Sequence, residues 1–402
     1  MKSNPVKIKL PKRRFLPHFL VIFLLVSFFI ILFSAVYINN QFSQILSQKN
    51  NLENEISGKN ETITNIQKEL DSLKNEDQFK VNAALKKDLA QIHTIYNQTV
   101  DSYESLLKLK NSTKPPEELD NLFTKILVFL SNKDLDNAGK TLKELNDKIA
   151  AELAKLATPA PVPASVPSSN TPPSAGYSRQ TVNTSAGSFV VSLVAADMSS
   201  TRVIVDTASN SDCQNDCPVL PLGDYVARNG AFAGINGSYF CPASYPSCAG
   251  KTNTFDLLVM NKNKTYFNSN NNVYSTNPAV IFGNEYIRFV GQALEWGRDT
   301  GIDSMLSNYP MLVQGGNIAY SGSGDPKITS RGNRSFVANK DNQVFIGVVH
   351  NAAVSESAQV LKALNMENAL NLDDGGSTAL WSGSYKLGPG RNLPNVILFV
   401  KK

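Results

Sequence analysis

The residue types best suited to chemistry gather in one octapeptide near the C-terminus. It reads Asn371-Leu372-Asp373-Asp374-Gly375-Gly376-Ser377-Thr378. Leucines alternate with polar residues up to Asp373, which predicts a strand with the leucines facing the core. The two glycines allow a tight turn and let a ligand approach the backbone closely. Because Asp-Gly pairs are also common in surface turns, the octapeptide alone fits either a site or a solvent-exposed turn.

Three further segments accompany this octapeptide, two before it in the sequence and one after it. They are Phe232-Ala233-Gly234-Ile235-Asn236-Gly237-Ser238-Tyr239-Phe240, Gly332-Asn333-Arg334-Ser335-Phe336-Val337-Ala338 and Pro394-Asn395. Together with the octapeptide they resemble the phosphodiester glycosidase family, over roughly residues 175–402. The family typically shows an Asn-Gly-Gly-Phe-Phe-like segment, an Arg-Thr-Ala-like segment and an Asn-Leu-Asp-Gly-Gly-Gly-Ser-like segment.

The resemblance implies hydrolysis of a sugar-1-phosphodiester between the anomeric carbon and the phosphate oxygen. Phosphate is a good leaving group, so a strong general acid is less necessary than in ordinary glycoside hydrolysis. Asp373 matches the family's aspartate and is the candidate base, nucleophile or oxocarbenium stabiliser. Asp374 stands where the family usually has glycine, so it is either a second catalytic carboxylate or a turn residue.

Arg334 is the candidate phosphate ligand, because a guanidinium can bind two phosphate oxygens at once. An arginine at this place could equally close an ion pair in the core. Asn236 could donate hydrogen bonds to sugar or phosphate, or cap the end of a strand. His350, which follows a predicted buried strand, is a candidate acid or base, with a structural role as the alternative.

The remaining site candidates would bind substrate through backbone or hydroxyl groups. They are Gly237, Gly375, Gly376, Ser377 and Thr378. Ser238 and Tyr239 replace the more usual Gly and Phe, which predicts an atypical pocket shape. Hard oxygen donors of the kind that Ca²⁺ accepts also gather here, so calcium is a candidate cofactor. These donors are Asn236, Asn371, Asp373 and Asp374.

The chain has four cysteines, in two closely spaced pairs, Cys213/Cys217 and Cys241/Cys248. Neither spacing is the two-residue separation of common zinc ribbons, and exported cysteines usually oxidise. Two local disulfides are the simplest pattern, although pairing between the loops is equally allowed. The second pair follows the Asn236–Phe240 segment, so it is expected at the rim of the site.

The N-terminus predicts a membrane anchor. Residues 1–18 contain six lysines and arginines and no acidic residue, in a chain with a net charge of +5, and residues 19–38 are apolar and uncharged. An α-helix needs about 20 apolar residues to cross a bilayer, and the basic flank stays in the cytoplasm. A cleaved signal peptide is the competing interpretation, with Phe33-Ser34-Ala35 a weak cleavage site. We expect an uncleaved single-pass anchor in the plasma membrane, with the rest of the chain outside the cell.

Residues 41–174 are expected to connect the anchor to the catalytic domain. Residues 41–77 show a heptad pattern interrupted at Lys59, which predicts a coiled-coil stalk and a homodimer, or else a solvated helix. Residues 78–156 have the periodicity of three antiparallel helices, with Pro116 at the start of the second. Residues 157–174 are rich in Pro, Ala and Ser and predict an extended linker.

Residues 175–402 predict an α+β domain, a mixed sheet with helices. Strands are expected at 189–196, 202–206, 231–236, 344–349 and 396–400, and helices at 221–229 and 355–364 with Ser355 as N-cap. Strands that end at Asn236, near His350 and at Asp373 would place polar groups along one edge of a shared sheet. Loops held by such a scaffold commonly form active sites.

Two function classes follow. The first is a membrane-anchored extracellular hydrolase that cleaves sugar-1-phosphodiesters in cell-envelope or extracellular polysaccharide. The second is a non-catalytic surface protein that binds phosphoglycan or a partner protein. Nucleic-acid binding is not supported, because the basic residues cluster beside the membrane anchor and no basic–aromatic stripe is present.

Overall fold

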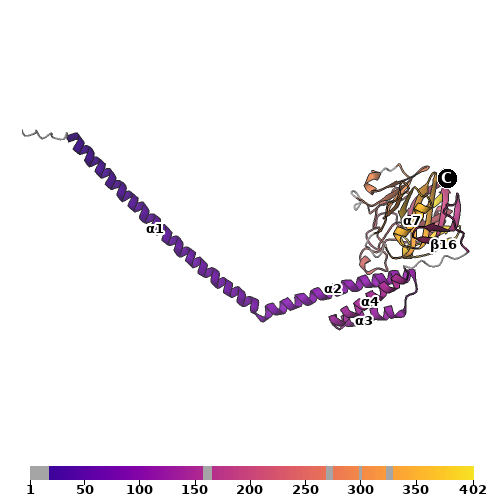
Figure 1. Ribbon diagram of the computed structural model, residues 1–402, viewed down its shortest axis with the longest axis horizontal. Helices are drawn as coiled ribbons and strands as arrows, with labels where there is room; N and C mark the ends of the chain where they lie inside the picture. Colours follow the sequence, from indigo (N-terminus) through magenta and orange to yellow (C-terminus); the bar gives the residue numbers. More distant parts are fainter. Residues whose placement is uncertain (1–17, 157–164, 269–274, 298–300, 323–328) are drawn as a thin grey trace, which may run out of the picture. The chain divides into compact units, whose positions relative to one another are not determined.

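The computed structural model describes residues 18–156, 165–268, 275–297, 301–322 and 329–402, so the basic tail lies almost wholly outside it. The chain divides into two units, 1–90 and 91–402. The first unit contains one long helix, α1 (His18–Asn75), and the start of α2 (Asp77–Ser112) (Figure 1). α1 is long and apolar enough near its N-terminal end to cross a membrane, by length and composition.

The heptad positions of the expected coiled coil all lie on α1. Leu52, Ile56 and Ile63 are each more than half exposed. Lys59, which interrupts the pattern, pairs with Glu55 one turn earlier. The apolar stripe is therefore present on a single helix, and the coiled coil and homodimer stay predictions.

Three helices form a small core at the beginning of the second unit. α2 leads into α3 (Glu117–Ser131) and α4 (Leu135–Leu156), and Pro116 is the N-cap of α3 as its fixed φ favours. The core side chains are leucines and isoleucines spaced at helical intervals. They are Leu106, Leu109, Leu119, Leu122, Ile126, Leu142, Leu145 and Ile149.

The second half of the expected linker packs against the sheet domain, whereas its first half, residues 157–164, lies outside the described residues. Ser168 forms a parallel bridge with Thr181 of β1. The side-chain amide of Gln180 donates to the carbonyls of Ser169 and Thr171 at 2.8 and 2.9 Å. The described part of the sheet domain therefore begins near residue 165.

Three antiparallel sheets make up the described part of this domain. The seven-stranded sheet has the order β1 (Gly176–Thr184), β2 (Gly187–Asp197), β13 (Gln343–Ala352), β12 (Gly332–Lys340), β14 (Asn368–Asn371), β10 (Met311–Gln314), β11 (Asn317–Ile318). The second sheet has the order β16 (Tyr385–Leu387), β15 (Leu380–Ser382), β4 (Ala233–Asn236), β17 (Asn395–Lys401), β3 (Thr201–Thr207). The third has the order β6 (Tyr266–Phe267), β5 (Val259–Met260), β9 (Ser304–Ser307), β7 (Ala279–Gly283), β8 (Tyr286–Val290).

The main core lies between these sheets and contains side chains from all three. Val337 and Ile346 of the first sheet, Ile397 of the second and Leu306 of the third belong to it and are fully buried. Helix α7 (Val354–Ala363) covers the opposite face of the seven-stranded sheet (Figure 1). Helix α5 (Leu222–Asn229) packs on the second sheet. A sheet-rich domain with helices, preceded by a long N-terminal helix, agrees with the predicted α+β class.

Two local predictions are wrong. Asn236 ends β4 of the second sheet, whereas His350 and Asp373 belong to or follow strands of the first, so these residues do not share one sheet. Helix α7 begins one residue before Ser355, and its N-cap is Ala353. The Glu356 carboxylate accepts the Ala353 N–H at 2.7 Å and does the capping that Ser355 was expected to do.

Both cysteine pairs form local disulfides, as the simplest pattern predicts. Cys213 bonds to Cys217 and Cys241 bonds to Cys248. The two loops lie beside each other, because Cys217 N–H donates to Thr252 O and Asn253 N–H donates to Cys241 O.

Candidate functional site

The predicted catalytic octapeptide forms a turn that joins the first two sheets. It follows β14, and Gly375 begins a single 3₁₀ turn, Gly375–Ser377, with a φ of +63° that favours glycine. Leu372 N–H donates to Ser335 O, and Asp373 N–H donates to Gly237 O, both at 2.9 Å. A Cβ at Gly237 would lie 1.8 Å from Asn395 Oδ1, so only glycine fits at this crossing.

Asp374 is held by a buried ion pair. Its Oδ2 lies 2.9 Å from Nη1 of Arg334, and its Oδ1 accepts the Ser335 N–H at 3.1 Å. The other two nitrogens of Arg334 donate to main-chain oxygens, Nε to Ala352 and Nη2 to Ser330. Burial raises the pKa of Asp374, and the Arg334 charge opposes that effect. Every guanidinium nitrogen of Arg334 therefore already has a partner, and the pair fixes the turn.

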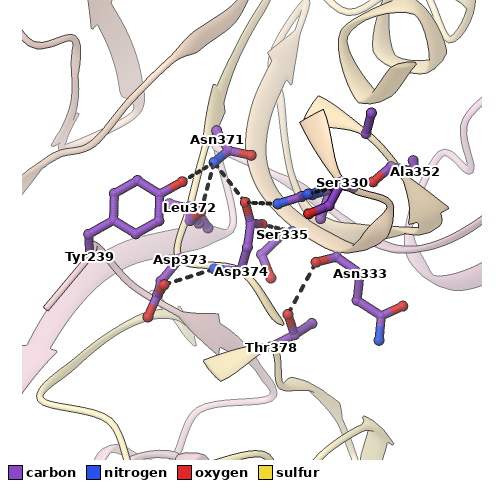
Figure 2. Close-up of polar contacts among 12 residues, drawn as sticks. Tyr239, Ser330, Asn333, Ser335, Ala352, Asn371, Leu372, Asp373, Asp374 and Thr378 are labelled. Atoms are coloured by element: carbon purple, nitrogen blue, oxygen red, sulfur yellow. Dashed lines mark hydrogen bonds and ion pairs between the residues drawn. The ribbon is translucent and has the colours of Figure 1, made fainter. Parts of the chain in front are cut away.

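The Asp373 carboxyl group has a pKa close to neutral pH. Its side chain points in a different direction from that of Asp374, and its Oδ1 accepts the Asp374 N–H at 2.9 Å (Figure 2). Burial raises the pKa of Asp373 to about 7, while Ser377 and the Arg391 charge act in the opposite direction. Ser377 Oγ is buried, and no described residue meets it in standard hydrogen-bond geometry. Part of the Asp373 side chain remains open to the adjoining pocket.

Asn236 lies directly behind this turn and is fully buried. Its Nδ2 donates to the main-chain oxygen of Asp373 at 2.7 Å. Its Oδ1 accepts the Ser335 hydroxyl at 2.9 Å and the Ala379 N–H at 3.1 Å. With three protein partners and no exposed surface, the amide supports the Asp373 backbone from the side away from solvent.

A pocket of about 460 Å³ opens in front of Asp373, a size that suits a small ligand. One wall is the loop closed by the Cys241–Cys248 disulfide. Another contains the rings of Tyr239 and Tyr309, whose centroids are 5.0 Å apart. The Tyr239 hydroxyl accepts a hydrogen bond from Nδ2 of Asn371 at 2.9 Å, and burial raises the pKa of this phenol (Figure 2).

Charged groups of both signs line this pocket. Arg331, Arg391 and Lys251 are among the cations, and Asp256 is among the anions. Helix α2, in the same unit, contributes Glu104, whose carboxylate accepts the Ser247 N–H at 2.9 Å. The pocket as a whole is therefore not uniformly positive.

The structure brings together some of the predicted site residues and separates others. Those that line the pocket are Arg334, Asp373, Asp374, Gly375 and Gly376. Ser377 and Thr378 are buried beneath the turn, and Thr378 Oγ1 donates to Asn333 O at 3.4 Å (Figure 2). Tyr245, Tyr309 and Arg391 were not predicted, because no motif contains them.

His350 lies elsewhere on the first sheet and is not one of the described residues that line the pocket. Its Nε2 is 2.9 Å from Ser192 Oγ on the neighbouring strand β2. Burial, together with the Arg179 charge, lowers the pKa of His350 to about 4. The imidazole is therefore neutral at physiological pH and bonded to a buried serine.

The oxygen donors expected to bind calcium mostly have protein partners. Asp374 is paired with Arg334, and Asn236 Oδ1 accepts two hydrogen bonds. Within the part of the chain that the structure describes, no three His, Cys, Asp or Glu side chains converge as metal ligands. Calcium stays a prediction from the sequence.

Comparison with known proteins gives one family match. Residues 229–400 match the family described as phosphodiester glycosidase. A search of the curated proteins found no match.

Solved structures resemble the sheet domain at low sequence identity. The catalytic domain of zebrafish N-acetylglucosamine-1-phosphodiester alpha-N-acetylglucosaminidase, auto-inhibited by its pro-peptide, is 14% identical, with a TM-score of 0.45 over 59% of this chain and 87% of that one. A hypothetical protein from Synechocystis is 15% identical, with a TM-score of 0.42 over 56% of this chain. This chain spans 62% of the Synechocystis protein, less than two thirds of its length.

The family match and the motifs agree in position. The match includes β4 with Asn236, β12 with Arg334, the Asp373 turn and the segment that carries Arg391. Residues 229–400 of this chain thus match the phosphodiester glycosidase family over the segments that carry these motifs.

Proposed function

We propose that the sheet domain hydrolyses sugar-1-phosphodiesters, breaking the bond between the anomeric carbon and the phosphate oxygen. The observation that carries this proposal is the Asp373 carboxyl group, which adjoins a pocket and has a pKa of about 7. A group with that pKa is ionised in a useful fraction of molecules at neutral pH yet still basic enough to take a proton. The family match supports the same reaction class.

The reaction needs an ionised Asp373 in either of two roles. As a base, Asp373 takes a proton from water while the water oxygen attacks the anomeric carbon. As a nucleophile, its own oxygen forms that bond, and water later hydrolyses the glycosyl ester. In both cases the electron pair of the broken carbon–oxygen bond stays on the departing phosphate monoester. The configuration of the freed sugar distinguishes the roles, because one displacement inverts and two retain.

The surrounding residues position this carboxylate. Asp374, paired with Arg334, fixes one end of the turn. Asn236 holds the Asp373 backbone through a hydrogen bond to its main-chain oxygen. Tyr309, which is 40% exposed, and Tyr239 present ring surface to the pocket and would contact the apolar face of a sugar. A carboxyl group with a raised pKa beside a pocket favours hydrolysis over binding alone.

The test uses the full chain in detergent, with intact disulfides, with and without Ca²⁺. It is incubated with uridine diphosphate N-acetylglucosamine and with other N-acetylglucosamine-1-phosphate diesters, and free sugar is quantified. We expect release from the wild-type protein and a loss of roughly 10²–10⁴-fold in Asp373→Asn. Asp341→Asn, the same change at an exposed position, should keep full activity. No release from folded wild-type protein would refute the hydrolase and favour a binding role.

We further propose that α1 anchors the domain at the outer surface of the plasma membrane. The apolar segment and the two disulfides support this location. The substrate would then be a phosphodiester-linked polysaccharide of the envelope or the extracellular matrix. Protease added to intact cells should remove the sheet domain, whereas protection of that domain until lysis would contradict this orientation.

A further inference from the structure

A phosphodiester substrate needs a cation beside the scissile bond, and two arginines of the pocket are already engaged. Arg334 forms its ion pair with Asp374 and also bonds two carbonyls. Arg331 pairs with Glu356, donates to Asn351 O and lies over the Phe189 ring. Both are at most 9% exposed. Neither guanidinium can turn toward a ligand without leaving a buried carboxylate unpaired.

Arg391 differs from Arg331 and Arg334 both in burial and in its partners. Its side chain is half-buried and lines the pocket. Among the residues that the structure describes, no carboxylate lies within ion-pair distance of it. Its guanidinium stands over the Tyr245 ring, 5.6 Å from the centroid, which orients the charge without neutralising it.

The backbone also fixes Arg391 next to the catalytic carboxyl group. Arg391 N–H donates to Gly376 O at 2.8 Å, three positions after Asp373 in the same turn. The two side chains interact electrostatically, since the Arg391 charge lowers the pKa of Asp373. Arg391 is thus hydrogen-bonded to the turn that carries Asp373, and both residues line the same pocket.

We propose that Arg391 binds the phosphate of the sugar-1-phosphodiester and stabilises the charge that develops on it. This inference rests on the proposed function and names the residue that selects an anionic leaving group. A guanidinium can donate to two non-bridging phosphate oxygens at once. That geometry places the phosphate beside Arg391 and directs the anomeric carbon toward Asp373.

The charge of the leaving group gives Arg391 a role beyond binding. The diester phosphate carries one negative charge, and cleavage of the carbon–oxygen bond leaves the electron pair on its oxygen, giving a second. A fixed cation interacts more strongly with the transition state than with the substrate, so it raises kcat as well as lowering KM.

The first arm of the test is kinetic and uses the full chain in detergent with uridine diphosphate N-acetylglucosamine. We expect Arg391→Gln to lower kcat/KM by roughly 10²–10³-fold, as loss of one charge-stabilising donor does in other enzymes. Arg391→Lys should restore part of that loss. Arg179→Gln removes the same charge from an exposed position on β1 and should change nothing. An unchanged kcat/KM in Arg391→Gln would overturn the inference.

The second arm measures binding and separates this inference from the proposed function. Calorimetry compares N-acetylglucosamine-1-phosphate with the uncharged methyl N-acetylglucosaminide on wild-type protein and Arg391→Gln. We expect the variant to lose affinity for the phosphosugar alone. That result without hydrolysis by the wild type would keep the subsite and reject the hydrolase. Equal affinity of both proteins for the phosphosugar would reject the subsite even if the wild type hydrolyses diesters.

Discussion

The side-chain amide of Asn236 donates a hydrogen bond of 2.7 Å to the main-chain oxygen of Asp373, 137 positions away in the sequence. Asn236 ends a strand of the second sheet, whereas Asp373 follows a strand of the first. Together with the bond from Asp373 N–H to Gly237 O, it holds the Asp373 turn across the boundary between the two sheets.

Replacing Asn236 with alanine should affect both stability and catalysis. The change leaves the Ser335 hydroxyl, the Ala379 N–H and the Asp373 carbonyl without this partner, at a cost of about 1–3 kcal/mol. Urea denaturation should show the lower midpoint, and kcat should fall more than KM rises. Asn317→Ala, in the exposed strand β11, serves as control. Equal midpoints for both variants would contradict the supporting role.

The pH dependence follows from the raised pKa of Asp373. Because the carboxylate must be ionised, kcat/KM should rise with pH through about 7 and then level off. A rate that falls across this range would instead make Asp373 a general acid.

The raised pKa of Asp373 also predicts that the folded protein loses stability as pH rises, whereas kcat/KM increases. The folded-state pKa lies above the ordinary value of 3.8, so the folded protein holds this proton more tightly than the unfolded chain. Stability contributed by Asp373 is then fully present below pH 4 and declines as pH rises toward 7. Asp373→Asn should remove that decline in a series of thermal melts. Parallel pH profiles for variant and wild type would contradict the raised pKa.

The buried pair of Arg334 and Asp374 should show strong coupling. Removing either partner alone leaves an unpaired buried charge and should cost about 3–5 kcal/mol. A double-mutant cycle with Arg334→Gln and Asp374→Asn should therefore be far from additive. The same cycle on the exposed pair Lys143–Asp147 of α4 should show no measurable coupling. Additivity at the first pair would mean that its charges are solvated.

The Cys241–Cys248 disulfide should matter for substrate binding. It closes the loop that forms one pocket wall, so Cys241→Ser with Cys248→Ser should raise KM with little change in kcat. The matched pair of changes at Cys213 and Cys217 removes the other disulfide, whose cysteines are not among the described pocket-lining residues. Identical KM values for the two double variants would show that the wall does not depend on this bond.

The sequence was sufficient to indicate polar and charged residues that stand next to apolar runs. The polar octapeptide after an apolar run indicated Asp373 and Asp374 as either a site or a turn. The family resemblance then identified Asp373 and Arg334 as the candidates. The local disulfides were the simplest pattern for the spacing, although pairing between the two loops was equally allowed.

The sequence could not predict which way each group faces. Asn236 was expected to touch substrate, yet both ends of its amide are used by residues distant in sequence. Tyr309 and Arg391 reach the pocket only through long-range pairing of the sheets, which no local pattern encodes. The single shared sheet was wrong for the same reason, because strand order depends on the packing of the whole chain.

The position of β17 has a consequence for biosynthesis. It lies between β3 and β4 in the second sheet, although it leaves the ribosome after every other described strand. Until residues 395–401 emerge, β3 has no described neighbour in that sheet, and Gly237 has no Asn395 to pack against. Arg391 likewise emerges after the Asp373 turn that it completes. A nascent chain therefore cannot assemble the proposed site until translation has passed the last described strand.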